Sequence, residues 1–214
     1  MAWRERIAKA VKQTAVGGEA EIQREVKSMV INEKGLLRAM KEAYKNDGYE
    51  IECIQTGSVK ELHIETTRWY VMCVLKNLPR KVLGLIVEHL GEIPEPGQAV
   101  QVKKSETQTK LLSHGRDSFG GIIAEDSVNP ASMVKTKLVY RYGNVWQQVR
   151  GNKVFWINPD LEDIMNVNTH VKCLGEKILS ITGTVSTVCI LPTPPLNAED
   201  KRMLEYLGSI QLHE

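Results

Sequence analysis

The sequence lacks paired cysteines and any recognisable metal-ligand pattern. Its four cysteines lie far apart without a CxxC pair, which argues against a zinc ribbon and against a dense disulfide scaffold. We expect buried free thiols, because cysteine packs as a small hydrophobe. His170 and Cys173 have the spacing of two ligands on one helical turn, but no second pair follows them, so no metal site is expected.

Cofactor loops and long apolar runs are also missing. Neither GxxxxGK[ST] nor a GxGxxG run after a strand is present, so no cofactor is expected. No run of 18 apolar residues occurs, which argues against a transmembrane helix. Residues 1–18 lack the long apolar core of a secretory signal and instead form a basic amphipathic segment. The expectation is a cytoplasmic protein. Its net charge of +2 predicts no partner class by itself.

Hydrophobic periodicity in the first half changes from helical to strand-like. Residues 19–48 show a helical stripe interrupted by Gly35, which favours two helices. Residues 49–58 and 60–75 then alternate as two strands of a hairpin that turns at Gly57 and Ser58. A helix follows, for which we expect Asn77 as the N-terminal cap and Gly91 at the end.

The second half repeats hairpins and helices in another order. We expect three strands after residue 133, a helix opened by Asn158, a hairpin around Gly183, a helix capped by Asn197 and closed by Gly208, and a C-terminal edge strand. Because the strands come as hairpins, the predicted class is α+β, with antiparallel hairpins and helices packed on one side. The expected divisions are the N-terminal segment 1–18, an α+β subdomain 19–104, a connecting region 105–132 and an α+β subdomain 133–214.

Acidic residues are absent from Ser127 to Pro159, although 26 of the 214 residues are Asp or Glu. Alternation in the strand Lys135 to Tyr142 places its cations on one face and Leu138, Tyr140 and Tyr142 on a core-facing side. A turn at Gly151 and Asn152 would pair Arg150 with Lys153 and Gln147 with Trp156. Cations and aromatic rings together are typical of single-strand nucleic-acid binders. The predicted anion-binding face, with a tryptophan available for stacking, consists of Lys135, Lys137, Arg141, Trp146, Arg150, Lys153 and Trp156.

Several interpretations of this face stay open. The acidic residues after Pro159 could fold back and neutralise it, leaving a solvated face or a subunit contact. The loop with His114, Arg116, Asp117 and Ser118 cannot readily form a Ser-His-Asp triad, because a triad needs groups from separate segments. Acid–base or metal-assisted hydrolysis centred on His114 and Asp117 stays an alternative.

The function we expect is that of a non-enzymatic interaction or accessory protein. Its partner would be another protein or a second copy of the chain, and nucleic acid or another polyanion is the sharper hypothesis. The alternatives are a hydrolase using the His114 and Asp117 loop, or a structural subunit of a larger assembly that makes contact through its C-terminal edge strand.

Overall fold

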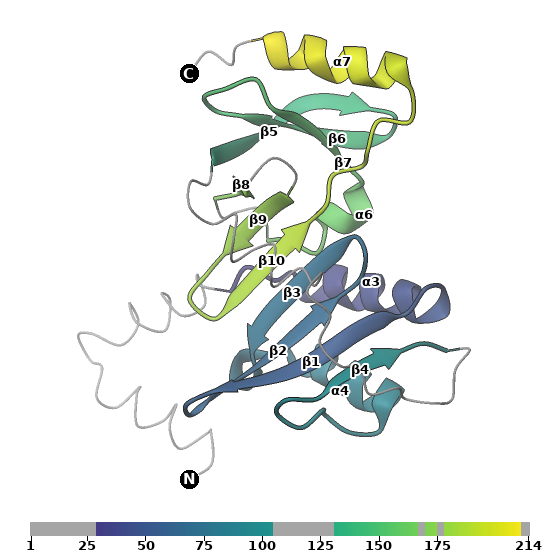
Figure 1. Ribbon diagram of the computed structural model, residues 1–214, viewed down its shortest axis with the longest axis vertical. Coiled ribbons are helices and arrows are strands. Elements are labelled where there is room, and N and C mark those ends of the chain that lie inside the picture. Colours follow the sequence, from purple (N-terminus) through teal and green to yellow (C-terminus); the bar gives the residue numbers. More distant parts are fainter. Residues whose placement is uncertain (1–28, 105–130, 167–169, 175–177, 211–214) are drawn as a thin grey trace, which may run out of the picture.

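A computed structural model describes residues 29–104, 131–166, 170–174 and 178–210. These residues form one ten-stranded sheet with the strand order β4-β1-β2-β3-β10-β9-β8-β5-β6-β7. Each neighbouring pair of strands is antiparallel. Four α-helices accompany the sheet in these residues, so the expected α+β class is confirmed at this level (Figure 1).

The first half contributes the strands at one end of the sheet and two helices that pack against each other. Its elements are α3 (Glu33–Lys45), β1 (Tyr49–Thr56), β2 (Val59–Glu65), β3 (Trp69–Val74), the 3-10 turn η1 (Leu75–Asn77), α4 (Arg80–Leu90) and β4 (Ala99–Val102).

Two expectations for this half are corrected in detail. The predicted hairpin turn at Gly57 and Ser58 is present, but residues 60–75 form two strands and not one. The chain reverses after Thr66, whose hydroxyl oxygen accepts from the backbone N–H groups of Arg68 and Trp69 at 3.1 and 3.2 Å. Asn77 ends η1 instead of capping α4, whose N-cap is Pro79.

Helix α3 begins at Asn32, whose side chain accepts from the N–H of Lys34 at 3.2 Å. Gly35 then lies where α3 meets the short helix α6 (Pro159–Glu162). A Cβ atom on Gly35 would lie 1.8 Å from the carbonyl oxygen of Asp163. The internal glycine therefore serves a close approach of two backbones. Most of the predicted helix before it lies outside the described residues.

The second half completes the sheet. Its other elements are β5 (Ala131–Tyr140), β6 (Gly143–Gln148), β7 (Val154–Ile157), β8 (Lys172–Leu174), β9 (Ile178–Thr182), β10 (Ser186–Ile190) and α7 (Ala198–Ser209). Asn158 and Asn197 cap α6 and α7 as expected. Gly208 lies inside α7 and not after it, and a Cβ atom there would lie 2.3 Å from the carbonyl oxygen of Asn152. Most of the predicted C-terminal edge strand lies outside the described residues.

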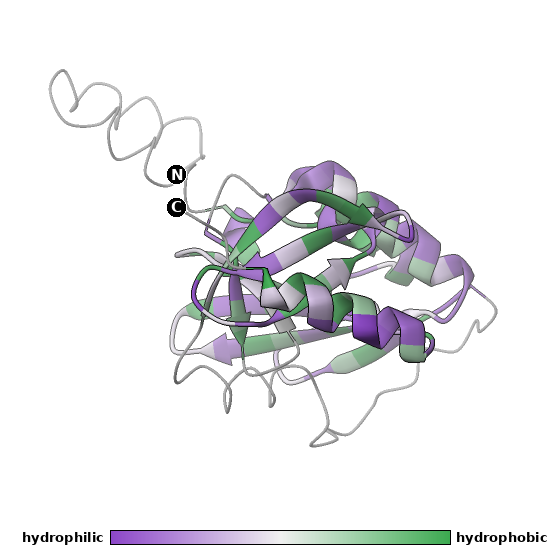
Figure 2. Cartoon of the chain, turned by 90° about the horizontal axis from the view of Figure 1, so that it is seen from above, coloured by the Kyte–Doolittle hydropathy of each residue, from purple (hydrophilic) through white to green (hydrophobic). Residues whose placement is uncertain are grey.

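One hydrophobic cluster joins both halves. It contains Leu36 and Ile64 from the first half together with Ile157 and Val188 from the second. Strand β3 pairs with β10, so the sheet continues without a break between the halves. The division into two subdomains stays a prediction. Hydrophobic and hydrophilic residues are interspersed along the strands and helices (Figure 2).

The four cysteines are free and buried, as expected. In the described part of the chain, none of the helices has the length and apolar character needed to cross a bilayer.

Candidate interaction site

All seven predicted site residues lie in the unit formed by β5, β6, β7 and the turns between them. The two tryptophans, however, face the interior. Trp146 is 3% exposed and Trp156 is 6% exposed, so neither indole ring is presented for stacking on a base. Trp156 lies against Gly143, where an added Cβ would collide with the indole nitrogen. These aromatic residues pack in the interior and stabilise the fold of the unit.

The hairpin between β6 and β7 has a different register from the predicted one. Trp156 pairs with Val145 and Val154 pairs with Gln147, a shift of two residues. The backbone N–H of Gln148 donates to the carbonyl of Lys153 at 2.9 Å, so the loop covers residues 149–152. Arg150 is therefore a loop residue and does not pair with Lys153 across the strands.

Lys135 is held by a buried carboxylate. Its ammonium group lies 3.0 Å from Oε1 of Glu162, a side chain in α6 that is nearly inaccessible to solvent. The indole N–H of Trp146 donates to the same oxygen at 3.2 Å, and the Asn144 amide donates to the other oxygen. A buried charge requires such partners. The acidic segment after Pro159 thus does fold back onto the basic strand.

Arg141 is held in the same way by Asp200 of α7. The guanidinium Nε lies 2.6 Å from Oδ1 of the Asp200 carboxylate, which is fully buried. That carboxylate also accepts from the hydroxyl of Tyr140 and from the N–H of Leu196 at 2.9 Å. The hydrogen bond from Tyr140, together with Leu196 and Arg141, holds the pKa of Asp200 below its ordinary value. Two of the five predicted cations therefore serve buried acids.

The other predicted cations are Lys137, Arg150 and Lys153. Lys137 lies exposed on β5 and Arg150 lies exposed in the loop before β7, whereas Lys153 is partly buried at the start of β7. Within the described residues neither Lys137 nor Arg150 forms an ion pair, and Lys153 does have an interaction partner. The basic face is thus smaller than the sequence suggested.

The turn between β5 and β6 is the unusual feature of the unit. Tyr140 pairs with Gly143, which leaves Arg141 and Tyr142 as the two turn residues. Their φ angles are +47° and +66°, the left-handed region that such two-residue turns require and that Asn-Gly normally supplies. Side chains other than glycine are strained there, at a cost of about 1–3 kcal/mol each. The Arg141–Asp200 ion pair holds this strained turn in place.

Tyr142 projects from this turn into solvent with 95% of its surface exposed. Two aliphatic neighbours on β5 are also exposed, Leu138 by 49% and Val139 by 65%. Leu138 lies within an irregularity in the pairing of β5 with β6 between Lys135 and Val139, and regular pairing resumes at Val139. The predicted core-facing role of Leu138 and Tyr142 is therefore wrong. We call Leu138, Val139, Arg141 and Tyr142 the hairpin tip.

Sequence reasoning missed the hairpin tip because it extended strand alternation through Tyr142. The short sequence between Tyr140 and Asn144 contains no Asn-Gly or Asp-Gly pair, the usual signal of a two-residue turn. Gly143 directly after Tyr142 was the available hint. Asp200 holds the turn and Glu162 holds the strand β5. Both acids lie far from these elements in the sequence, so no local pattern indicated the two ion pairs.

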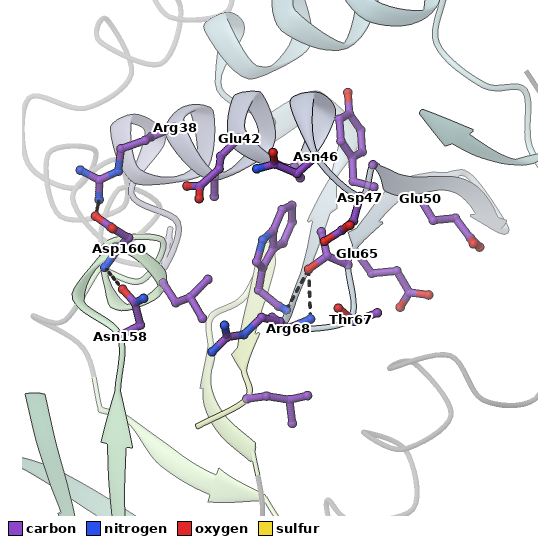
Figure 3. Close-up of a pocket in the computed structure, with 18 of the residues that line it drawn as sticks. Arg38, Glu42, Asn46, Asp47, Glu50, Glu65, Thr67, Arg68, Asn158 and Asp160 are labelled. Carbon is purple, nitrogen blue, oxygen red and sulfur yellow. Dashed lines mark hydrogen bonds and ion pairs between the residues drawn. The ribbon is translucent and has the colours of Figure 1, made fainter. Parts of the chain in front are cut away.

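A second feature is a cleft of about 610 Å³ between α3, the β2–β3 turn and α6. Glu42 projects into it from α3 and Asn46 from the C-cap of that helix, and Thr67 and Arg68 lie on the opposite side (Figure 3). Its lining includes apolar groups from Ala39, Trp69, Leu161 and Leu191. The cleft thus combines apolar and polar groups, as ligand pockets do.

The charge of the cleft is predominantly negative. Among the described residues, five carboxylates line it but only two guanidinium groups, those of Arg38 and Arg68. Arg38 is engaged by Asp160 at 3.2 Å and by Asp163 at 2.7 Å. The remaining lining carboxylates are those of Glu42, Asp47, Glu50 and Glu65. Glu50 and Glu65 pair directly across β1 and β2, which concentrates negative charge on this side of the sheet.

Two cysteine thiols and two histidine rings of the described residues are buried or hydrogen-bonded. Burial raises the pKa of the Cys73 thiol to about 12 and that of Cys189 to about 11, whereas a nucleophilic cysteine needs a lowered pKa. Nδ1 of His63 lies 2.9 Å from the hydroxyl of Tyr70, and Nδ1 of His89 lies 2.9 Å from that of Tyr49.

Metal and hydrolase chemistry find no additional support in these residues. No group of three or more His, Cys, Asp and Glu side chains within the described ranges is placed to hold a metal ion. The loop with His114, Arg116, Asp117 and Ser118 lies outside the described residues.

Comparisons of the chain with protein-family models, with curated proteins and with solved structures found no match.

Proposed function

We propose that this protein is a non-enzymatic binding protein that contacts a macromolecular partner through the hairpin tip. The observation that carries the proposal is Tyr142, an almost fully exposed aromatic residue in a strained backbone conformation. A residue in such a conformation costs stability and persists only where the surrounding structure enforces it. Here the buried Asp200 enforces it through Arg141, yet the Tyr142 side chain gains no packing in return.

Tyrosine at an exposed, fixed position suits recognition. Its ring offers a large contact area with few rotatable bonds, and tyrosine is enriched among the residues that dominate binding energy. Leu138 and Val139 add apolar surface next to the turn. A tip that is already ordered loses less conformational entropy on binding than a flexible loop would.

The test is the variant Tyr142→Gly. Because glycine adopts positive φ without strain, we expect the free energy of unfolding to rise by about 1 kcal/mol, while the contact surface is lost. Thermal unfolding measures the first effect. The second is measured by comparing the proteins that immobilised wild type and variant retain from extracts of the native host. Tyr206→Ala removes another exposed tyrosine, on α7, and is the matched control. A variant that is less stable, or that retains the same partners as wild type, would contradict the proposal.

A polyanionic partner is the second candidate. It is favoured by the exposed cations Lys137 and Arg150, with Tyr142 taking the stacking role that the buried tryptophans cannot fill. A salt series with a fluorescent single-stranded oligonucleotide distinguishes the two. For a polyanion, Lys137→Gln should reduce the dependence of log K on log salt by about one unit. An unchanged slope excludes a phosphate contact by Lys137.

A further inference from the structure

The hairpin tip and the cleft complement each other in charge and in polarity. The tip carries apolar side chains and lies next to Lys137, an exposed cation that forms no ion pair within the described residues, whereas the described lining of the cleft has apolar groups and more carboxylates than guanidinium groups. Neither feature includes a residue of the other. In the described structure the tip is open to solvent, because Tyr142 is 95% exposed, so it does not occupy the cleft of its own chain.

We infer that the occupant of the cleft is the hairpin tip of a second copy of this chain. The inference rests on the proposed function, because it names the partner of the same hairpin tip. Tyr142 would enter the cleft toward Trp69 and Leu191, and Lys137 would meet the carboxylates that exceed the guanidinium groups there. A volume of about 610 Å³ lies within the usual range of about 300–1,000 Å³ for binding pockets, which leaves room for the tip.

A contact of this kind joins two different surfaces, so it is heterologous. Each copy then keeps one unused tip or one unused cleft, and association continues into an open chain or closes into a ring. A hairpin inserted into a cleft buries a small area compared with stable interfaces, so we expect micromolar affinity. Because exposed charges contribute, salt should weaken the association.

The association itself is measured by sedimentation velocity over protein concentrations from about 1 µM to about 1 mM, the range that suits so small an interface. The average molecular mass of wild type should rise steadily above that of the monomer as the concentration rises. It should level off at a dimer only if two copies close into a ring. Tyr142→Ala should weaken association by about 30-fold, the effect of a contact residue that dominates binding. Glu42→Gln/Glu65→Gln should weaken it by removing two cleft charges.

Matched controls separate these effects from general ones. Tyr206→Ala removes an exposed tyrosine outside the tip, and Glu92→Gln/Glu205→Gln makes the same charge change at exposed positions outside the cleft. Both should associate as wild type does. Circular dichroism of each variant shows whether its fold is retained. Tyr142 and Glu42 are exposed and Glu65 is partly buried, so a loss of association counts against the cleft only when the spectrum of the double variant matches that of wild type.

The decisive sample is an equimolar mixture of the two defective variants. Tyr142→Ala keeps an intact cleft and Glu42→Gln/Glu65→Gln keeps an intact tip, so the mixture can form one good interface and should stop at a one-to-one dimer. A mixture that stays monomeric, or a Tyr142→Ala variant that associates like wild type, overturns the inference.

The outcome also separates this inference from the proposed function. Suppose that wild type stays monomeric at every concentration, while Tyr142→Gly is more stable and no longer retains the partners of wild type. The second-copy inference is then contradicted and the proposed function is supported. If Tyr142→Ala associates as strongly as wild type, and Tyr142→Gly retains the same partners as wild type, both the second-copy inference and the proposed function are contradicted.

Discussion

At the scale of single residues, two buried carboxylates decide which cations remain available. Glu162 engages Lys135, and Asp200 engages Arg141, so these cations stabilise the fold first. A buried acid without its partner would be costly, so each of these two carboxylates requires a cation from the acid-free part of the chain. Two cations of the acid-free window therefore pair with acids that lie outside it.

Glycine at position 35 gives a residue-scale prediction. Gly35→Ala places a Cβ 1.8 Å from the Asp163 carbonyl oxygen, so α3 and α6 must separate. We expect the free energy of unfolding to fall by about 1–3 kcal/mol, measured by chemical denaturation. Gly84→Ala in α4 is the control, because nothing lies within 4 Å of its Cβ position. It should raise stability by about 0.4–1 kcal/mol. Equal effects of both substitutions would show that α3 does not need close contact with α6.

At the scale of elements, the β5–β6 hairpin and α7 are joined through Asp200. The side chain accepts from Tyr140 before the turn and from the N–H of Leu196 before α7, and it pairs with Arg141 in the turn. One carboxylate therefore fixes both the hairpin tip and the start of the last helix. This arrangement makes the tip sensitive to protonation of Asp200.

The pH dependence follows from the lowered pKa of Asp200. A carboxyl whose pKa is lower in the folded state stabilises the fold above its unfolded pKa, near 3.8, and loses that contribution as pH falls through the folded value. We expect wild type to be more stable than Asp200→Asn at pH 7, and the difference to shrink below about pH 3.8. Denaturation followed by near-ultraviolet circular dichroism from pH 7 to about pH 2 measures it. A difference that is constant with pH would show that the charge of Asp200 is not involved.

At the scale of the whole molecule, the pairing of β3 with β10 makes one sheet and the cluster around it makes one core. We call the junction between β3 and β10 the seam. Residues from both halves pack in that cluster, so loss of packing at the seam destabilises both halves. The number of unfolding transitions therefore tests the prediction of two subdomains, because one cooperative unit unfolds in a single transition.

Ile190 lies at this seam, fully buried and paired with Trp69. We expect wild type to unfold in one transition and Ile190→Ala to lower its free energy of unfolding by about 2–5 kcal/mol. Tryptophan fluorescence and far-ultraviolet circular dichroism should report the same midpoint for each protein. Two separate transitions, with only one shifted by the substitution, would instead support two independently folding subdomains.

Local sequence rules determined much of the secondary structure. Asn158 and Asn197 cap helices, and the turn at Gly57 and Ser58 lies where alternation breaks, because these features depend on neighbouring residues alone. The hairpin class and the burial of the cysteines follow from the same local patterns.

Only the tertiary structure decided the candidate site. Whether Trp146 faces the core, whether Lys135 is free, and whether Tyr142 continues a strand or forms a turn all depend on residues far along the chain. Glu162 in α6 binds Trp146 and Lys135, and Asp200 in α7 binds Arg141 in the turn before Tyr142. Periodicity records which side chains share a face, but it carries no information about which distant carboxylate is buried against that face, and burial sets the energetic demand for a partner.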